Sequence, residues 1–182
     1  MIAFSYTGLM VRLSLLAAVL AFACGCSREG SGPVRLLVAV PITGAMAASG
    51  QGVERGVRMA VEDETGLGGL PEVEVVVSDD RSDPFEAASV ARRAVDDPRV
   101  FAVIGHLTSG CAIEASRIYA QAALTMITPS ATATTLTTQQ DRPDWGGDRV
   151  VFRLPPSDAM QGEFAAEYAV KRLSLKRFVI VH

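Results

Sequence analysis

Short apolar runs recur along the chain, separated by segments whose small and apolar residues follow a helical spacing. Each run ends in glycine, proline or a polar loop, which is typical of buried strands in a parallel sheet. The pattern predicts strands at residues 34–40, 72–77, 101–104, 124–127 and 150–154. It predicts helices at residues 51–65 and 157–173. Two more helices are predicted between these: one is capped by Asp83 and has Pro84 as its first residue, and the other is capped by Thr108 or Ser109.

The regular alternation of strand and helix predicts an α/β fold with a doubly wound, mostly parallel sheet. Residues 133–148 are mostly polar and are predicted to leave the core as an excursion. The last helix is predicted to bury Ala165, Tyr168 and Ala169, and residues 177–181 are predicted to form a sixth strand. A closing parallel strand without a following helix leaves a sheet face uncovered, so we expect the sequence to be truncated.

The first segment has the pattern of an export signal. Residues 13–23 are apolar apart from one serine, a run too short to span a bilayer. Small residues precede both Cys24 and Cys26, as in the bacterial lipobox, where a cysteine is lipidated. Cys26 is the preferred lipidation site because a glycine precedes it and a polar tether, residues 27–33, follows; Cys24 is the alternative. We therefore expect an exported lipoprotein, membrane-anchored through Cys26 and facing the periplasm or the cell exterior.

Composition is that of a globular protein and limits the chemistry. The 182 residues are 49% hydrophobic and 20% charged, with a net charge of −3, which argues against nucleic acid as a partner. The chain has three cysteines and two histidines, without the spacing of a zinc site. No cofactor and no metal are expected. Asp79, Asp80 and Asp83 lack the spacing of a calcium loop and are interpreted as loop and cap residues.

Two loops after predicted strands, residues 106–111 and 128–132, carry hydroxyl side chains. The side chains belong to Thr108, Ser109, Ser130 and Thr132. In an open α/β sheet, ligands bind outside the carboxyl ends of the strands. Hydroxyls donate and accept hydrogen bonds, and a helix N-terminus favours an anion, so these loops could hold a free amino acid. The alternative is structural, because such residues also form helix caps and turns.

A catalytic alternative is a cysteine nucleophile. Cys111 follows the start of a predicted helix, where a thiolate is favoured, and His106 is the nearby base. The chain lacks a G-x-S-x-G nucleophile elbow. We interpret Cys111 as a packed small residue and expect no catalysis.

Several short motifs follow one another in a fixed order. They are Pro41-x-Thr-Gly44 with Gly50 and Gly56, Asp79-Asp80-x-x-Asp83-Pro84, Val103-Ile-Gly-His106 with Ser109, Ser130-Ala-Thr132 after Pro129, Phe152-Arg153, and Asp158 with Gln161-Gly162. In this order they resemble the N-terminal half of the leucine/isoleucine/valine-binding proteins. These are substrate-binding components of ABC transporters for branched-chain and other amino acids, with the type I periplasmic binding fold. The resemblance covers about residues 34–182.

The resemblance implies two α/β lobes that close on the ligand like a hinged clamp. It places the first, ligand-binding lobe at residues 34–154. It places the start of an incomplete second lobe at residues 155–182. The signal peptide at residues 1–26 and the tether at 27–33 precede both lobes.

The resemblance also implies roles for particular residues. Ser109 matches the serine that meets the ligand carboxylate, and Ser130 a residue whose backbone carbonyl accepts from the ammonium. Thr132 matches a threonine that contacts both ends of the ligand, and Asp158 an acidic residue near the ammonium. Ser49 stands where some members carry a tryptophan against the ligand side chain. A disulfide found in some members would join the positions of Ser82 and Thr108, and is absent here.

The implied function is capture of an amino acid, branched-chain or related, or of a small amide for uptake. The implied partners are an ABC permease and its ATPase. The alternative is a ligand-sensing receptor module of the same fold with no role in transport.

Overall fold

The structure is a computed structural model that describes residues 32–66, 68 and 72–179. The predicted signal peptide, with Cys24 and Cys26, and most of the tether therefore lie outside the described residues. Among the residues described, no helix combines the length and the apolar character needed to cross a bilayer.

Five parallel strands form one sheet in the order β2-β1-β3-β4-β5. They are β1 (Val34–Ala39), β2 (Val73–Ser78), β3 (Val100–Gly105), β4 (Thr125–Thr128) and β5 (Val151–Arg153). The first five of the six predicted strands and the doubly wound α/β fold are confirmed. The helices are α2 (Ala47–Gly66), α3 (Pro84–Asp96), α4 (Ser109–Gln121), α5 (Thr135–Thr138) and α6 (Asp158–Lys171), with a 3₁₀ turn at Gln139–Asp141.

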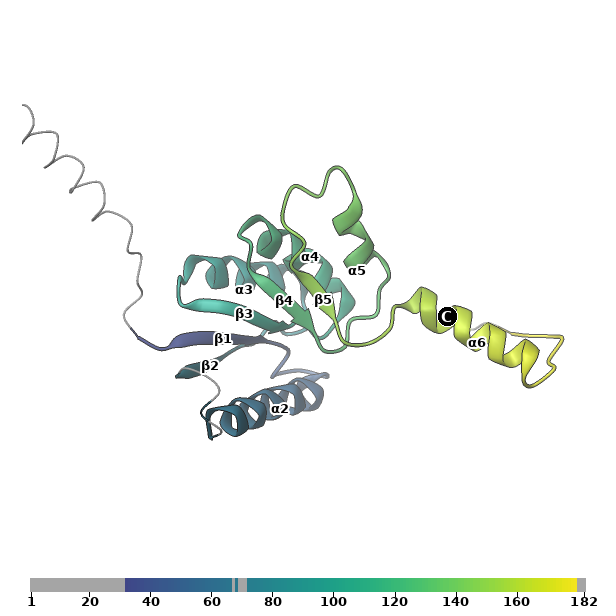
Figure 1. The fold of residues 1–182 in the computed structure, drawn as a ribbon, viewed down its shortest axis with the longest axis horizontal. Coiled ribbons are helices and arrows are strands. Elements are labelled where there is room, and N and C mark those ends of the chain that lie inside the picture. Colours follow the sequence, from purple (N-terminus) through teal and green to yellow (C-terminus); the bar gives the residue numbers. More distant parts are fainter. Residues whose placement is uncertain (1–31, 67, 69–71, 180–182) are drawn as a thin grey trace, which may run out of the picture. The chain divides into compact units, whose positions relative to one another are not determined.

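Both faces of the sheet are covered, and β1 shows this most directly. Successive strand side chains point to opposite faces. Leu37 and Ala39 pack in the larger core with residues of α3 and α4, whereas Val38 and Val40 pack with residues of α2. Figure 1 shows α2 on one side of the sheet and α3 with α4 on the other. Because the second half of β1 is buried on both faces, Leu36 to Val40 form a continuous apolar run rather than an alternating one.

Two glycines let the chain pass closely where β1 and β3 end. A Cβ atom at Gly50 would lie 1.8 Å from the carbonyl oxygen of Pro41, so α2 can approach the loop after β1 only without a side chain there. Gly105 has φ +151°, and a Cβ atom there would lie 2.1 Å from the carbonyl oxygen of Ala39. These contacts fix the loops after β1 and β3 side by side.

The prediction that residues 133–148 leave the core is wrong. The segment contains α5 and the 3₁₀ turn, and Leu136 and Trp145 are buried in the larger core. Trp145 donates its indole N–H to the carbonyl oxygen of Asp148 at 3.0 Å, and the guanidinium of Arg117 lies 5.6 Å from its ring centre. Two large apolar side chains anchor a segment whose other residues are mostly polar. The polar composition of the segment as a whole therefore gave the wrong prediction.

The predictions for the end of the chain are also corrected. Helix α6 forms as expected, but it has no buried residue: Ala165 and Tyr168 are exposed, and Ala169 is half-buried. Residues 177–179 form no strand, and residues 180–181 lie outside the described part. A strand forms only where a neighbouring strand can pair with its backbone, and within the described residues no strand pairs with this segment.

Candidate functional site

The strand order places the candidate site between β1 and β3. From β1 the chain crosses to β2 on one side, and it then returns to β3 on the other. Connections that diverge in this way leave a crevice at the carboxyl ends of the two strands, which is where open α/β sheets bind ligands. The loop before α2 and the loop before α4 border this position, and the loop after β4 is next to them in the sheet order.

Ser109 is the first residue of α4 and is joined to the loop after β4. Its hydroxyl oxygen accepts a hydrogen bond from the backbone N–H of Ala133 at 3.2 Å. Thr108 occupies the N-cap position with extended backbone, but its side chain makes no cap hydrogen bond. The expectation of a side-chain cap is therefore not met, and the first N–H groups of α4 keep their capacity to bind an anion.

Thr132 links this loop to the start of α6. Its carbonyl oxygen accepts from the backbone N–H of Asp158 at 2.8 Å and from Arg153 at 2.9 Å. Thr132 is half-buried, and the side chain of Asp158 is exposed. Ser109, Thr132 and Asp158 are thus held around a single loop, although they come from α4, the loop after β4, and α6.

Ser130 and Ser49, the other two predicted site residues, lie in different elements. Ser130 is exposed in the same loop as Thr132, and its N–H approaches the hydroxyl of Thr128 at 3.4 Å. Ser49 precedes the helix that was predicted at residues 51–65, but it lies in the first turn of α2, where it is exposed. Among the described residues no hydrogen bond joins Ser49 to the other four candidates. The structure therefore brings together four of the five predicted site residues by contact or by chain proximity.

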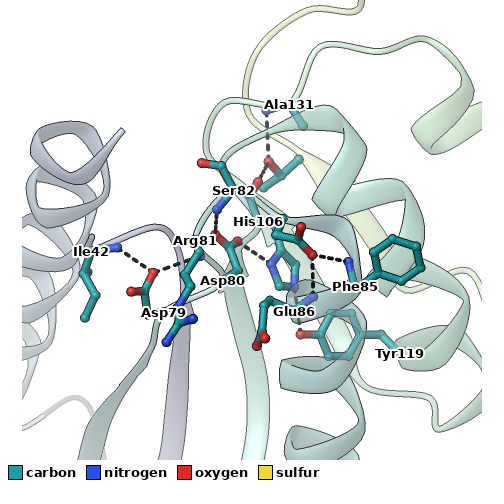
Figure 2. Close-up of polar contacts among 12 residues, drawn as sticks. Ile42, Asp79, Asp80, Arg81, Ser82, Phe85, Glu86, His106, Tyr119 and Ala131 are labelled. Atoms are coloured by element: carbon teal, nitrogen blue, oxygen red, sulfur yellow. Dashed lines mark hydrogen bonds and ion pairs between the residues drawn. The ribbon is translucent and has the colours of Figure 1, made fainter. Parts of the chain in front are cut away.

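A buried polar chain that the sequence did not reveal lies beneath the site (Figure 2). The carboxylate of Asp80 lies 2.7 Å from Nδ1 of His106, and Nε2 of His106 lies 3.1 Å from the hydroxyl of Tyr119. All three residues are fully buried. Burial, with the nearby charge of Asp80, raises the pKa of the Tyr119 phenol above its ordinary value. The carbonyl oxygen of His106 accepts from the hydroxyl of Thr128 at 2.6 Å, which connects this chain to the loop after β4.

The hydrogen bonds of Asp80, His106 and Tyr119 argue against His106 as the base that would activate Cys111. Both ring nitrogens of His106 already have partners in Asp80 and Tyr119. Cys111 is buried, and its burial raises the pKa of the thiol, so the reactive thiolate is disfavoured. Among residues 32–66, 68 and 72–179, no cluster of three or more side chains suited to a metal ion is present.

Asp79 fixes the loop after β1, as shown in Figure 2. Its carboxylate accepts from the backbone N–H of Ile42 at 3.1 Å and from that of Arg81 at 2.9 Å. It also accepts from the hydroxyl of Thr43. Partial burial acts to raise the pKa of Asp79, but the hydrogen bonds from Thr43, Arg81 and Ile42 outweigh it and hold the pKa below its ordinary value. Asp83 caps α3, as predicted, by accepting from the N–H groups of Phe85 at 2.8 Å and Glu86 at 3.0 Å.

The chain is similar to a group of bacterial binding proteins. An amino acid binding protein of Pseudomonas aeruginosa is 33% identical over 175 residues, which are 95% of this chain and 45% of that protein. A leucine-, isoleucine-, valine-, threonine- and alanine-binding protein of the same organism is 34% identical, over 94% of this chain and 44% of that protein. The chain thus spans less than half the length of these relatives.

A solved structure is similar to this chain over the same N-terminal part. The branched-chain amino acid transporter substrate-binding protein of Streptococcus pneumoniae, crystallised with isoleucine, superposes with a TM-score of 0.66 at 30% identity. The superposition covers 79% of this chain and 39% of that one. A sequence model of the periplasmic binding protein family matches residues 33–182. The chain therefore belongs to the periplasmic binding protein family, and within that family to the branch of the leucine/isoleucine/valine-binding proteins.

Proposed function

We propose that this protein is the exported solute-binding component of an ABC transporter, which captures an amino acid, branched-chain or related, or a small amide, and delivers it to a permease and its ATPase. The observation that carries the proposal is the hydrogen bond from the N–H of Ala133 to the hydroxyl of Ser109. It holds Ser109 against the residue that follows Thr132, at the carboxyl ends of the strands, where open α/β sheets bind ligands. Relatives named for amino acid binding and for leucine, isoleucine and valine binding support the substrate class.

In the proposed mechanism, different groups of the protein bind the carboxylate and the ammonium of the ligand. The hydroxyls of Ser109 and Thr132 and the uncapped N-terminus of α4 would bind the carboxylate. The backbone carbonyl of Ser130 and the exposed carboxylate of Asp158 would bind the ammonium. Ser49, at the start of α2, would border the ligand side chain. None of these groups forms or breaks a covalent bond, so we propose binding without catalysis.

Calorimetric titration of the full-length exported protein tests the site. Ser109→Ala and Thr132→Ala should each weaken the binding of L-leucine, L-isoleucine or L-valine by about 1.5–3 kcal/mol, the range for a lost hydrogen bond to a charged group. Ser89→Ala is the matched control, because the Ser89 hydroxyl donates only within α3, to the carbonyl oxygen of Phe85. Unchanged affinity in both site variants would refute the proposed site.

An uptake assay tests the role in transport. Cells that lack the gene should lose uptake of the radiolabelled ligand, and the wild-type gene should restore it. Normal uptake in the deletion strain, together with altered expression or signalling, would instead assign the protein to sensing.

A further inference from the structure

Arg153, the last residue of β5, lies against the backbone of the loop after β4. Its Nη1 donates to the carbonyl oxygens of Thr132 and Ala133, both at 2.9 Å. Its Nη2 donates to the carbonyl oxygen of Thr134 at 3.3 Å and to the hydroxyl of Thr137 at 2.5 Å. A single planar guanidinium thus binds three successive carbonyl groups of the loop that carries Thr132.

In the part of the chain that the structure describes, Arg153 is not paired with an acidic side chain. None of the ion pairs among the described residues includes Arg153. Partial burial lowers the pKa of its guanidinium, and the charge of Asp158 opposes this from a distance. An arginine still keeps its proton at any ordinary pH. The positive charge is therefore held in place by neutral oxygens and adds to the positive potential at the loop.

The same loop segment has further attachments on its other sides. The carbonyl oxygen of Thr132 also accepts from the backbone N–H of Asp158, and the N–H of Ala133 donates to Ser109. The hydroxyl of Thr134 accepts from the N–H of Ala159 at 3.2 Å. Residues 132–134 therefore connect β5, α4 and α6, and Arg153 binds the carbonyl group of each of the three.

We infer that Arg153 is a positioning residue for ligand binding: its guanidinium fork fixes residues 132–134 so that Thr132 and the Ser109–Ala133 contact are set for the ligand, and so that this loop stays attached to the start of α6. The inference rests on the proposed function for its effect on affinity. Its effect on the loop itself does not depend on any ligand.

Two substitutions separate the fork from the charge. Arg153→Met removes both, whereas Arg153→Lys keeps the charge but cannot bind several carbonyl groups in one plane. Arg149→Met is the matched control, because Arg149 is four residues away in the chain, is largely exposed and forms an ion pair with the exposed Asp141.

Titration of the full-length protein with L-leucine, L-isoleucine and L-valine gives the first readout. Arg153→Met should weaken binding between roughly tenfold and a hundredfold, the range for lost hydrogen bonds that involve a charged group. Arg153→Lys should lose most of the same affinity, and Arg149→Met should lose none. Wild-type affinity in Arg153→Lys would overturn the role of the fork.

Site-resolved amide hydrogen exchange without ligand gives the second readout. In Arg153→Met the amides of Ala133, Asp158 and Ala159 should exchange at least about tenfold faster, because they are bonded to groups of the loop or of Ser109. Amides within α3 should keep their wild-type rates. Equal acceleration throughout the sheet, or none at Ala133, would overturn the inference. If wild-type protein bound none of the three amino acids, the proposed ligand class would fail, and the exchange data would still decide whether Arg153 fixes the loop.

Discussion

Asp80, His106 and Tyr119 form a fully buried polar chain, and each link depends on its neighbours. A buried polar atom that loses its partner costs more than the hydrogen bond was worth, because no water replaces the partner. Tyr119→Phe would leave Nε2 of His106 without its partner while keeping the ring in place. Among the described residues no hydrogen bond joins Tyr119 to a proposed ligand residue, so the change should affect stability rather than affinity.

We therefore expect Tyr119→Phe to lower the free energy of unfolding by about 1–3 kcal/mol. Urea denaturation followed by circular dichroism measures this value. Tyr168→Phe serves as control, because Tyr168 is the half-exposed tyrosine of α6. A variant as stable as wild type would show that the hydroxyl contributes nothing to the buried chain.

At the scale of single residues, the sequence predicted types of role better than partners. Asp83 as a cap was predicted correctly because its partners are two and three residues away. Asp79 and Asp80 were correctly assigned to a loop. Their separate tasks follow from partners in other elements, and the partner of Asp80 is His106, 26 residues further along. No local pattern indicates which of two neighbouring carboxylates faces inward.

At the scale of elements, the start of α3 is the most clearly specified. Asp83 accepts two N–H groups and Pro84 follows in the first turn, where its missing N–H is not needed. Replacing Asp83 by alanine should lower the free energy of unfolding by about 0.5–2 kcal/mol. Thermal unfolding measures the change, with Asp96→Ala at the other end of α3 as control. Equal stability of Asp83→Ala and wild type would contradict the capping role.

Strands β1 to β5 were predicted correctly because each is a short run rich in apolar residues. Each also pairs with a neighbour that was recognisable in the sequence. The errors occur where an element depends on distant contacts. Leu136 and Trp145 join the core from a polar segment, and α6 forms through local hydrogen bonds while its apolar residues stay exposed.

In the candidate site, too, the features that depend on local sequence could be predicted and those that depend on distant contacts could not. The positions of Ser109, Ser130 and Thr132 could be predicted, because all three follow closely on strand ends, where a parallel sheet binds ligands. The role of Arg153 could not be predicted, because its partners are backbone carbonyl groups, which carry no side-chain signal.

At the scale of the whole molecule, the proposed lipid anchor determines where the protein acts. The family indicates an exported, periplasmic protein, and we propose that Cys26 is lipidated after removal of residues 1–25. Cys26→Ser should release the protein from the membrane fraction and abolish palmitate labelling, because the acyl chains hold it to the bilayer. Release by Cys24→Ser alone would move the site to Cys24. Retention in both variants and in the double variant would refute lipidation.

The position of β1 in the sheet also governs when the protein can fold. Among the described residues β1 is the first strand in the chain, yet it lies between β2 and β3, and its residues 37–39 are buried. Its second neighbour is complete only at Gly105. At about 5–20 residues per second, synthesis leaves β1 without its full set of partners for several seconds. A chain that must cross a membrane before it folds gains time from this order of strands, since its secretion-competent state lasts longer than that of a chain that begins with a hairpin.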